Sequence, residues 1–555
     1  MIGVIADSSD HDVVREFFEL FKTPWEFYGK DGEYDVLLST GERPPENGAK
    51  LVLCYAGRQT RFDSERKIQV GRQRTRSCIL SYEKHRIPIY GETITFAGNE
   101  SRLLRDEDSQ ECVAFLHQSN EGALARIGYD LFNEIRMLLT VGQPPANANL
   151  PALELHIALL RDSIIGSGIS LVEIPPVPEG YRFVVCLTHD VDHPSIRQHK
   201  WDRTMFGFLY RAIFGSLQRI IHGRISIRDL FKNWAAALKL PFIYLGLAKD
   251  FWREFDELYL DVEKRLPTTY FVIPFKNRSG NNSHGSAPAL RAARYGAEDI
   301  ADTIRNLKAV GCEIALHGID AWADSSSGRV ELEEIQRVTG ETETGVRMHW
   351  LYYDQHSPAA LEQGGAAYDS SIGYNETVGY RAGTTQVYKP LQAARLLELP
   401  LHVMDTALFY SAYLNLSQKL ARILLDRMAN NAVRFGGCLT INWHDRSLAP
   451  ERLWSECYRE LIEDLKTRGA WFATAREVVD WFGKRRSAVF ETACVAPTVA
   501  RARVESDGCD NLPGLRLRIH RSQGSLQNRV YGSEEYTDVP VAEGVDRAIP
   551  VEASR

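Results

Sequence analysis

Short apolar segments alternate with helical ones between residues 180 and 485, and polar side chains gather directly after the apolar segments. Strands alternating with helices predict a parallel, barrel-like α/β sheet. In such sheets the active site lies at the carboxyl ends of the strands. The predicted strands are Arg182–Leu187, Thr268–Ile273, Glu313–Leu316, Gly436–Asn442 and Ala470–Thr474, and the predicted helices are Glu298–Ala309 and Leu453–Thr467.

Three of these strands are followed by residues that can hold a metal or move a proton. The first leads into Thr188–His193 (THDVDH), where one carboxylate could hold a cation while the other acts as a base. His317 follows the third strand, and His444 follows the fourth. Each group alone has an ordinary alternative: a loop whose Asp caps a helix, or a histidine satisfied within the core. Their order along the chain is more specific than any one of them.

Taken together, these groups resemble the motifs of the NodB-type polysaccharide deacetylases, carbohydrate esterase family four. The run Thr188–Asp192 (THDVD) resembles the family's first motif, and Gly311–His317 (GCEIALH) resembles the approach to its second. Arg347 stands where the arginine motif is expected, and Leu439–His444 (LTINWH) resembles the last motif. The resemblance covers about residues 180–485. It implies a distorted (β/α) barrel with a metal-dependent active site.

The resemblance implies catalytic roles for four residues. Asp190 matches the catalytic base, and Arg347 matches the arginine that orients that base. His444 matches the general acid, which Asp405 is expected to hold in place. In this mechanism the base takes a proton from water and the acid protonates the leaving amine.

The metal ligands that the resemblance implies are Asp192 and His317, but a third is missing from its usual position. The family places a second histidine four residues after the first, where this chain has Ala321. His349 is the best replacement because it lies in the next motif and is neutral near pH 7. A divalent metal, with zinc the expected ion, is therefore the predicted cofactor. The alternatives are ligation by Asp320 or His193, and a site that binds metal poorly.

The implied activity is removal of N-acetyl groups from a cell-surface polysaccharide or its lipid-linked precursor. Leu439 would lie beside the acetyl methyl group, and Trp443 would contact the substrate. Two alternatives stay open: hydrolysis of another non-peptide C–N bond on the same barrel, and a non-catalytic carbohydrate-binding module. A serine triad is a weaker alternative because the sequence has no G-x-S-x-G motif.

The regions on either side of the predicted barrel complete the domain organisation. Residues 1–165 are expected to form a small α/β domain of unknown role, and a proline-rich linker is predicted near Pro175–Pro178. Residues 490–555 are expected to form a partly loose C-terminal extension. The N-terminal domain is predicted to contain strands at Met1–Ala6, Asp35–Ser39 and Leu51–Tyr55, and helices at Val13–Phe21 and Ala123–Leu139.

Composition excludes several classes of protein. Hydrophobic residues make up 44% and charged residues 25%, which is ordinary for a globular protein. The formal net charge of −7 gives no basic footprint, so no nucleic-acid partner is expected. No apolar run is long enough to predict a spanning helix, and the N-terminus does not resemble a signal peptide. Nine scattered cysteines without a C-x-x-C pair predict neither a disulfide framework nor a thiolate zinc site. A cytoplasmic protein is therefore expected.

The stretch from about residue 193 to 266 is too long for an ordinary βα loop and is predicted to be an insertion. Residues 193–239 carry seven more cations than anions, although the chain as a whole is acidic. Bulky apolar side chains are interleaved with these cations. Two interpretations are open. One is a lid over the barrel mouth. The other is an interfacial segment, about residues 197–235, that contacts anionic lipid at the inner face of the membrane.

Overall fold

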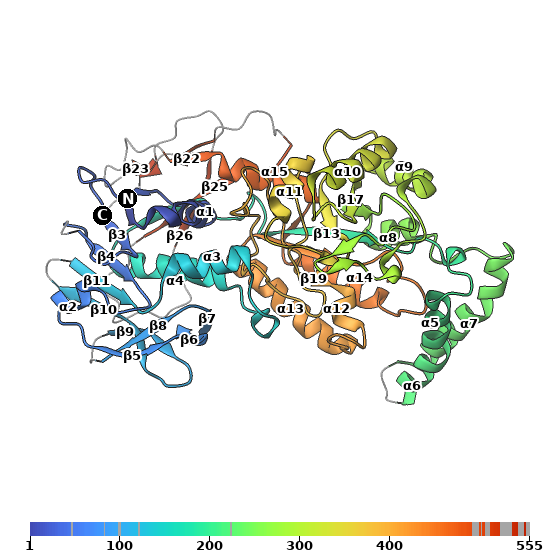
Figure 1. Ribbon diagram of the computed structural model, residues 1–555, viewed down its shortest axis with the longest axis horizontal. Coiled ribbons are helices and arrows are strands. Elements are labelled where there is room, and N and C mark those ends of the chain that lie inside the picture. The colour runs from blue at the N-terminus through green and yellow to red at the C-terminus, as the bar shows by residue number, and fades with distance from the viewer. Residues whose placement is uncertain are drawn as a thin grey trace. The chain divides into compact units, whose positions relative to one another are not determined.

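The computed structural model describes residues 1–45, 48–82, 84–97, 101–119, 122–221, 225–490, 499–500, 502–504, 511–521, 536–541 and 549–550. The chain divides into two compact units, each built from separate stretches of sequence (Figure 1). Unit 1 comprises Met1–Gly180, Tyr380–Leu391 and Asp480–Arg555, and unit 2 comprises Tyr181–Gly379 and Gln392–Val479. Most of the predicted loose tail, as well as Cys494 and Cys509, lies outside the described residues. The other seven cysteines are free and buried.

Unit 2 is built on a seven-stranded sheet in which each strand pairing is parallel. The strand order is β18-β17-β14-β13-β20-β19, and β21 also pairs with β13. The mixed α/β architecture with a parallel sheet, which the sequence predicted, is confirmed. The strands are β13 (Phe183–Val191), β14 (Thr268–Val272), β17 (Glu313–Gly318), β18 (Val346–Met348), β19 (Val403–Met404), β20 (Cys438–Asn442) and β21 (Ala470–Phe472).

The central strand β13 is longer than the sequence predicted. The prediction ended this strand at Leu187, but backbone pairing continues to Val191 because β14 lies alongside residues 187–191. On its other edge, residues 184–188 pair with β20. All nine residues of β13 are buried. Asp190 is therefore part of the strand itself, and Asp192 is the first carboxylate after it.

Irregular segments continue the hydrogen-bonded order beyond β18. The Ser370 N–H donates to the Val346 carbonyl (2.8 Å), and the Asp369 N–H donates to the Leu397 carbonyl (2.9 Å). Further along, the His402 N–H donates to the Thr440 carbonyl of β20 (3.1 Å). Backbone bonding thus leads from β18 through residues 369–370 and 397–402 toward β19 and β20.

Helices of unit 2 connect these strands, and a side chain caps the start of α5, α7, α10 and α13. Asp324 accepts the Ser327 N–H (2.9 Å) at the start of α10, and Gly340 ends this helix in the left-handed conformation. The predicted helix at 298–309 begins as a 3₁₀ turn and becomes α-helical only at Ala301. The helices are α5 (Arg203–Tyr210), α6 (Ser216–Ile221), α7 (Ile227–Tyr244), α8 (Phe255–Glu263), α9 (Ala301–Ala309), α10 (Ser325–Thr339), α11 (Ser357–Gly364), α12 (Asp405–Phe409), α13 (Gln418–Phe435) and α14 (Ser455–Thr467). The helix α15 (Ala475–Arg486) crosses the boundary between the units.

Unit 1 contains an eleven-stranded mixed sheet in the order β2-β1-β3-β4-β11-β10-β9-β6-β7, with β5 and β8 beside it. Strands β1 to β4 and β11 are parallel, whereas β5 to β10 add an antiparallel part that the sequence did not predict. The strands are β1 (Ile2–Ile5), β2 (Trp25–Phe27), β3 (Val36–Ser39), β4 (Leu51–Tyr55), β5 (Val70–Arg74), β6 (Cys78–Tyr82), β7 (His85–Ile89), β8 (Thr93–Phe96), β9 (Ser101–Asp106), β10 (Cys112–Ser119) and β11 (Gly122–Ile127). The helices are α1 (His11–Phe21), α2 (Arg61–Glu65), α3 (Leu131–Thr140) and α4 (Ala152–Gly166).

The helix predicted over residues 123–139 is wrong in its first part. Residues 123–127 belong to β11, which pairs in parallel with β4. The helix α3 starts only after Asp130, whose side chain accepts the Asn133 N–H (3.1 Å). A short apolar run fits a buried strand and a buried helix equally well, so spacing alone could not place this boundary.

Short antiparallel pairings complete unit 1. The strand β25 lies between β12 and β26, and two further pairs join β22 to β24 and β23 to β27. Within the region predicted to be a partly loose extension, residues 515–520 thus form a paired strand. The bounds are β12 (Leu171–Glu173), β22 (Ala488–Phe490), β23 (Val499–Ala500), β24 (Ala502–Val504), β25 (Leu515–His520), β26 (Tyr536–Val541) and β27 (Ile549–Pro550).

Candidate metal centre and catalytic groups

Five predicted site residues stand at the carboxyl ends of five strands of the sheet in unit 2. Parallel strands bring these ends to one edge of the sheet, so residues distant in sequence come together there. The side chains that converge are Asp192 after β13, His317 in β17, His349 after β18, Asp405 after β19 and His444 after β20.

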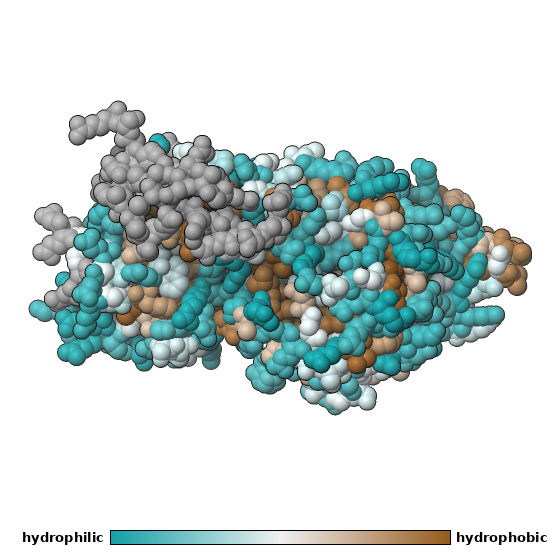
Figure 2. All heavy atoms as spheres, turned by 90° about the horizontal axis from the view of Figure 1, so that it is seen from above, coloured by the Kyte–Doolittle hydropathy of each residue, from teal (hydrophilic) through white to brown (hydrophobic). Residues whose placement is uncertain are grey.

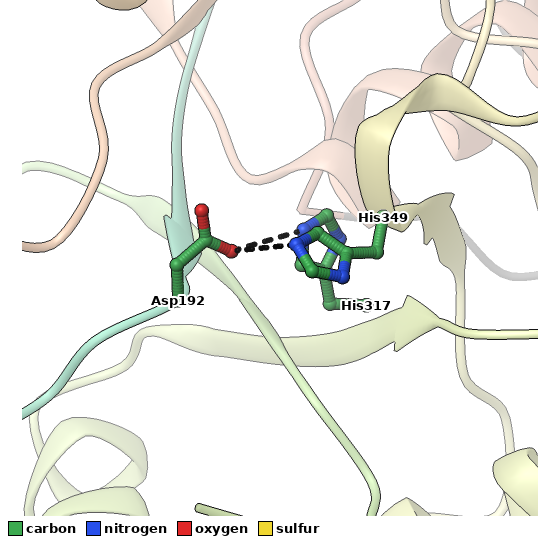
Figure 3. A group of neighbouring side chains, drawn as sticks. All are labelled: Asp192, His317 and His349. Carbon is green, nitrogen blue, oxygen red and sulfur yellow. Dashed lines mark ion pairs between the residues drawn. The ribbon is translucent and has the colours of Figure 1, made fainter. Parts of the chain in front are cut away.

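Three of these side chains form a compact group of metal-ligating atoms. Nε2 of His317 and Nε2 of His349 each lie 3.5 Å from Oδ1 of Asp192. One ligating atom from each residue lies within 4.8 Å of the other two. Figure 3 shows both imidazole rings directed toward the same carboxylate oxygen. The structure therefore brings together the ligand set that the sequence predicted, including His349.

This group fits a divalent metal ion. Zinc bonds of about 2.0–2.2 Å in a tetrahedral site place neighbouring ligand atoms about 3.3–3.6 Å apart, which matches the two separations from Asp192. Oδ1 of Asp192 is buried and has no hydrogen-bond partner among the described residues. Such an orphaned buried oxygen is costly unless a cation or a donor occupies the site. Two imidazoles and one carboxylate are also a common zinc ligand set.

Electrostatics keep these groups in the forms that bind a metal. Burial alone would raise the pKa of Asp192, but His349, His317 and His444 hold it well below the usual range. Burial lowers the pKa of His349 to about 3, and Asp192 only partly opposes this shift. At neutral pH the carboxylate is ionised and His349 is neutral. A metal ion can bind both without displacing a proton from either.

Hydrogen bonds from outside the group hold the His317 ring and the backbone of His349. Nδ1 of His317 donates to the Arg347 carbonyl (3.0 Å), which orients the ring with Nε2 facing Asp192. The buried Arg291 guanidinium donates to the carbonyls of His349 (2.8 Å) and Ile319 (2.9 Å). It thereby joins the loops that follow β17 and β18. No pattern in the sequence had predicted this role of Arg291.

Asp190 lies beside the metal-ligating group and is held by two side chains. Arg347 Nη1 donates to Oδ1 of Asp190 (3.0 Å), and Asn442 Nδ2 donates to Oδ2 (2.7 Å). Oδ2 is 3.9 Å from Nε2 of His317. Burial would raise the pKa of Asp190, but His317, Arg347 and His444 outweigh it and lower the pKa. Asp190 is therefore an ionised, oriented carboxylate able to accept a proton.

His444 also lies beside the metal-ligating group and is oriented by Asp405. Nδ1 of His444 donates to Oδ1 of Asp405 (2.6 Å), and Oδ2 of Asp405 accepts the His444 N–H (2.8 Å). Nε2 points toward Asp192, with 3.8 Å between Nε2 and Oδ2. Burial would lower the pKa of His444, but Asp405, Asp192 and Asp190 raise it to about 10. His444 is thus protonated at neutral pH, as a general acid must be.

The other metal ligands that the sequence left open lie outside this group. Oδ1 of Asp320 accepts the Asn281 N–H (2.7 Å), and Nδ1 of His193 contacts Nε2 of His199 (3.0 Å). Ala321 is fully buried and packs against α10, where a Cβ built at Gly328 would lie 3.5 Å from the Ala321 Cβ. The usual histidine therefore has no room at this position.

The two predicted substrate-binding residues are completely buried. Leu439 lies within β20, and Trp443 stacks on Tyr458 with ring centroids 4.8 Å apart. Phe409 packs against the same indole ring edge-on. Neither Leu439 nor Trp443 presents accessible surface in this conformation, and their contact with substrate stays a prediction.

Several residues that position the site were not predicted. Glu331 of α10 accepts the N–H groups of Ile319 (2.8 Å) and Asp320 (2.7 Å), which fixes the loop after His317. Tyr259 of α8 donates its hydroxyl to the His444 carbonyl (2.7 Å). Asn442 stood in the motif around His444, yet its role toward Asp190 became visible only when β13 and β20 were paired.

Comparison with known proteins adds the following. No protein-family model matches the sequence. No curated protein matches it either. Among solved structures, the chain is similar to a Mycobacterium smegmatis protein named as a polysaccharide deacetylase, with 19% identity, a TM-score of 0.35, and coverage of 56% of this chain and 95% of that chain.

Two further solved structures are carbohydrate esterases. Bacillus subtilis PdaA, a family 4 carbohydrate esterase, has 14% identity and a TM-score of 0.24 over 41% of this chain and 74% of that chain. A family 4 acetyl xylan esterase from Clostridium thermocellum, in complex with a cobalt ion, has 15% identity and a TM-score of 0.24 over 54% of this chain and 92% of that chain.

Proposed function

We propose that the chain is a metal-dependent hydrolase that removes N-acetyl groups from a glycan, on a distorted (β/α) barrel of the polysaccharide deacetylase type. One observation carries the proposal. Asp192, His317 and His349 converge as a group that could hold a metal ion, and both the ionised Asp190 and the protonated His444 lie beside it. A carboxylate base and an imidazolium acid beside a ligand set are the groups that hydrolysis of an amide requires.

In this mechanism the protein's own residues orient the reactants and move the protons. A divalent metal held by Asp192, His317 and His349 would lower the pKa of a bound water and polarise the substrate carbonyl. Asp190, fixed by Arg347 and Asn442, accepts the proton of the attacking water. The Nε2 proton of His444 goes to the leaving amine, while Asp405 stabilises the imidazolium before it gives up that proton.

The test is acetate release from an N-acetylglucosamine oligomer by the zinc-loaded protein. Wild-type protein should release acetate and an equal amount of free amine. Asp190→Asn and His444→Ala should each reduce kcat about 10²–10⁴-fold while zinc content is unchanged. Bound zinc with hydrolysis of only small amides would contradict the glycan substrate. Absence of bound metal together with carbohydrate binding would contradict hydrolysis altogether.

A further inference from the structure

The insertion between β13 and β14 contains a helical hairpin with two apolar faces. We use this term for residues 201–247, which include α5, a π-helical turn at Arg211–Gly215, α6 and α7 (Figure 1). One face is buried within unit 2. Its side chains pack against Trp252 and Ala449 and are Met205, Phe208, Ala212, Ala236, Leu240 and Ile243.

The second apolar face of the hairpin is exposed. Of the 25 large hydrophobic side chains that are exposed in the described residues, 14 lie in the hairpin, which is less than a tenth of the chain. Trp201 and Leu238 are each 73% exposed, and Leu247 is 75% exposed. The brown spheres at the right-hand end of Figure 2 show this surface. The other exposed members are Phe206, Tyr210, Ile213, Phe214, Leu217, Ile221, Ile227, Phe231, Trp234, Phe242 and Leu245.

On α7 the exposed apolar side chains form one stripe. Ile227, Phe231, Trp234, Leu238 and Phe242 recur every three or four residues, which places them within an arc of about 80° on a regular helix. A row of exposed cations borders this stripe and consists of Arg228, Lys232 and Lys239. Amphipathic helices that lie in the surface of a bilayer have this arrangement of an apolar stripe beside lysine and arginine.

The base of the hairpin lies at the site edge of the sheet. The insertion starts at His193, directly after the predicted ligand Asp192. It packs on Ala449, which lies five residues after His444. The exposed apolar surface is thus connected to the same strand ends that carry the catalytic groups.

We propose that the exposed face of the helical hairpin binds the surface of an anionic lipid bilayer. The charge of the hairpin favours lipid over a second copy of the chain. In a two-fold dimer the same face meets itself, which would bring the rows of cations together. Anionic headgroups neutralise them instead. No helix of the described residues is long and apolar enough to cross a bilayer.

Sedimentation with lipid vesicles tests this proposal without any assay of activity. Wild-type protein should sediment with vesicles that contain 30% phosphatidylglycerol and not with pure phosphatidylcholine. Phe231→Ser/Leu238→Ser should abolish binding. Lys232→Glu/Lys239→Glu should weaken it by at least about fivefold for each lost cation. Lys50→Glu changes a lysine of unit 1 whose side chain is 69% exposed; it is the control and should bind as wild type does.

Two outcomes would overturn membrane binding. If wild-type protein stays in solution with anionic vesicles at low salt, and Phe231→Ser/Leu238→Ser changes only the turnover of a water-soluble substrate, the hairpin is a lid. If the protein is a dimer that Phe231→Ser/Leu238→Ser converts to a monomer, with no vesicle binding, a second copy covers this face.

Three arginines lie near one another at the base of the hairpin. Nη2 of Arg452 donates to the hydroxyl oxygen of Tyr410 (3.2 Å), and Nη2 of Arg446 lies 3.5 Å from the same oxygen. Arg211, from the hairpin, interacts electrostatically with both guanidinium groups. None of the three arginines forms an ion pair with a carboxylate in the described part of the chain.

The Arg452 side chain is buried, and those of Arg211 and Arg446 are half-buried. Tyr410, Asp445 and Asp192 favour the charged form of Arg446 and raise its pKa. Arg452 is only 4% exposed, and the Nε atoms of Arg452 and Arg211 are buried with no hydrogen-bond partner among the described residues. Burial together with Arg452 and Arg446 lowers the pKa of Arg211 to about 9. Glu451 offsets part of this charge from a distance, but its Oε1 accepts the indole N–H of Trp252 (3.1 Å). The two Nε donors without a partner, beside three like charges, fit a bound anion that would accept their hydrogen bonds.

The arginine cluster adjoins the catalytic groups. Arg446 follows His444 by two residues, and Tyr410 follows directly on α12, which begins at Asp405. We infer that Arg211, Arg446 and Arg452 bind a phosphate group of the substrate; assigning the anion to the substrate rests on the proposed function. Planar guanidinium groups bind phosphate oxygens in pairs, which explains the use of arginine in place of lysine.

Inorganic diphosphate is the direct probe, used with metal-free protein in a chelator so that the metal ligands do not contribute. Wild-type protein should bind it in calorimetry. Arg452→Met should weaken binding at least tenfold, and Arg452→Lys should weaken it less. Arg468→Met is the matched control, because Arg468 pairs with Asp464 on the outside of unit 2. Equal binding by wild type and Arg452→Met, both folded by circular dichroism, would overturn the site.

A second experiment identifies the source of the phosphate. N-acetylated sugars with and without a phosphate group are compared as substrates of the zinc-loaded enzyme. A kcat/KM at least tenfold higher for the phosphorylated sugar, lost in Arg452→Met, supports substrate phosphate. Diphosphate binding without this preference would assign the cluster to free phosphate and overturn its role toward substrate. If no sugar is hydrolysed, the proposed function fails while the calorimetry still decides whether the anion site exists.

Discussion

Replacing His349 with alanine should weaken zinc binding at least about 100-fold. Groups that only support a ligand change metal affinity about 10–100-fold. Nε2 of His349 belongs to the ligand group itself, 3.5 Å from Oδ1 of Asp192. The loss should therefore be at the upper end of that range or beyond it, which corresponds to about 2.8 kcal/mol of binding free energy or more.

Unfolding in buffered zinc measures this loss. At a free zinc concentration 100 times the wild-type Kd, binding should raise the free energy of unfolding of wild-type protein by about 2.7 kcal/mol. At the same concentration a variant that binds 100-fold more weakly gains only about 0.4 kcal/mol. Each protein is compared with its own sample in chelator, so any effect of His349→Ala on packing cancels.

The matched controls are the other residues that the sequence offered as the third ligand. His193→Ala and Asp320→Asn lie outside the ligand group and should gain as much free energy from zinc as wild type does. A zinc-dependent gain for His349→Ala within 0.5 kcal/mol (about twofold in Kd) of wild type would refute the assignment. So would a loss in Asp320→Asn as large as that in His349→Ala.

Three further outcomes follow from buried carboxylates. Asp405→Asn should keep zinc and lower kcat about 10²–10⁴-fold, because His444 loses the carboxylate that orients it; unchanged kcat would contradict this role. In unit 1, Asp63→Ala should lower the free energy of unfolding by about 3–5 kcal/mol because it leaves the fully buried Arg126 without its carboxylate partner. Urea unfolding of Asp63→Ala/Arg126→Met should show that much of this loss is recovered. Burial raises the pKa of Glu154 to about 7, so its protonated form is favoured in the folded state and its ionisation destabilises the fold as pH rises from about 5 to 8. Relative to wild type, Glu154→Gln should become more stable over that range by up to about 3 kcal/mol, whereas a pH-independent difference would contradict the shift.

The sequence predicts the residues of the site better than it predicts the residues that hold them in position. Asp190, Asp192, His317 and His444 follow apolar segments, and strand ends in a parallel sheet converge whatever the intervening loops do. Arg291 gave no comparable signal. Its partners are backbone carbonyls of His349 and Ile319, which every residue possesses, so no side-chain pattern marks the pairing.

Errors in the predicted elements have a similar origin. The apolar run at 123–127 is short, and only its pairing with β4 shows that it is a strand. The first barrel strand was ended early because His189 and Asp190 are polar. In the folded chain Nε2 of His189 contacts Glu263 (2.9 Å) and Asp190 contacts Arg347, so polar residues continue a fully buried strand. Both partners are more than 70 residues away in sequence, beyond the reach of local pattern.

Adjacent placement of β17 and β18 has a consequence for how such centres can be recognised. The two imidazoles that face Asp192 stand 32 positions apart along the chain, but their ring centroids lie only 4.9 Å apart because they come from the ends of adjacent strands. The crossover between the two strands can lengthen or shorten without moving either nitrogen. A search that demands two histidines at a fixed short interval will therefore overlook chains of this kind, whereas one that counts donors at neighbouring strand ends will find them.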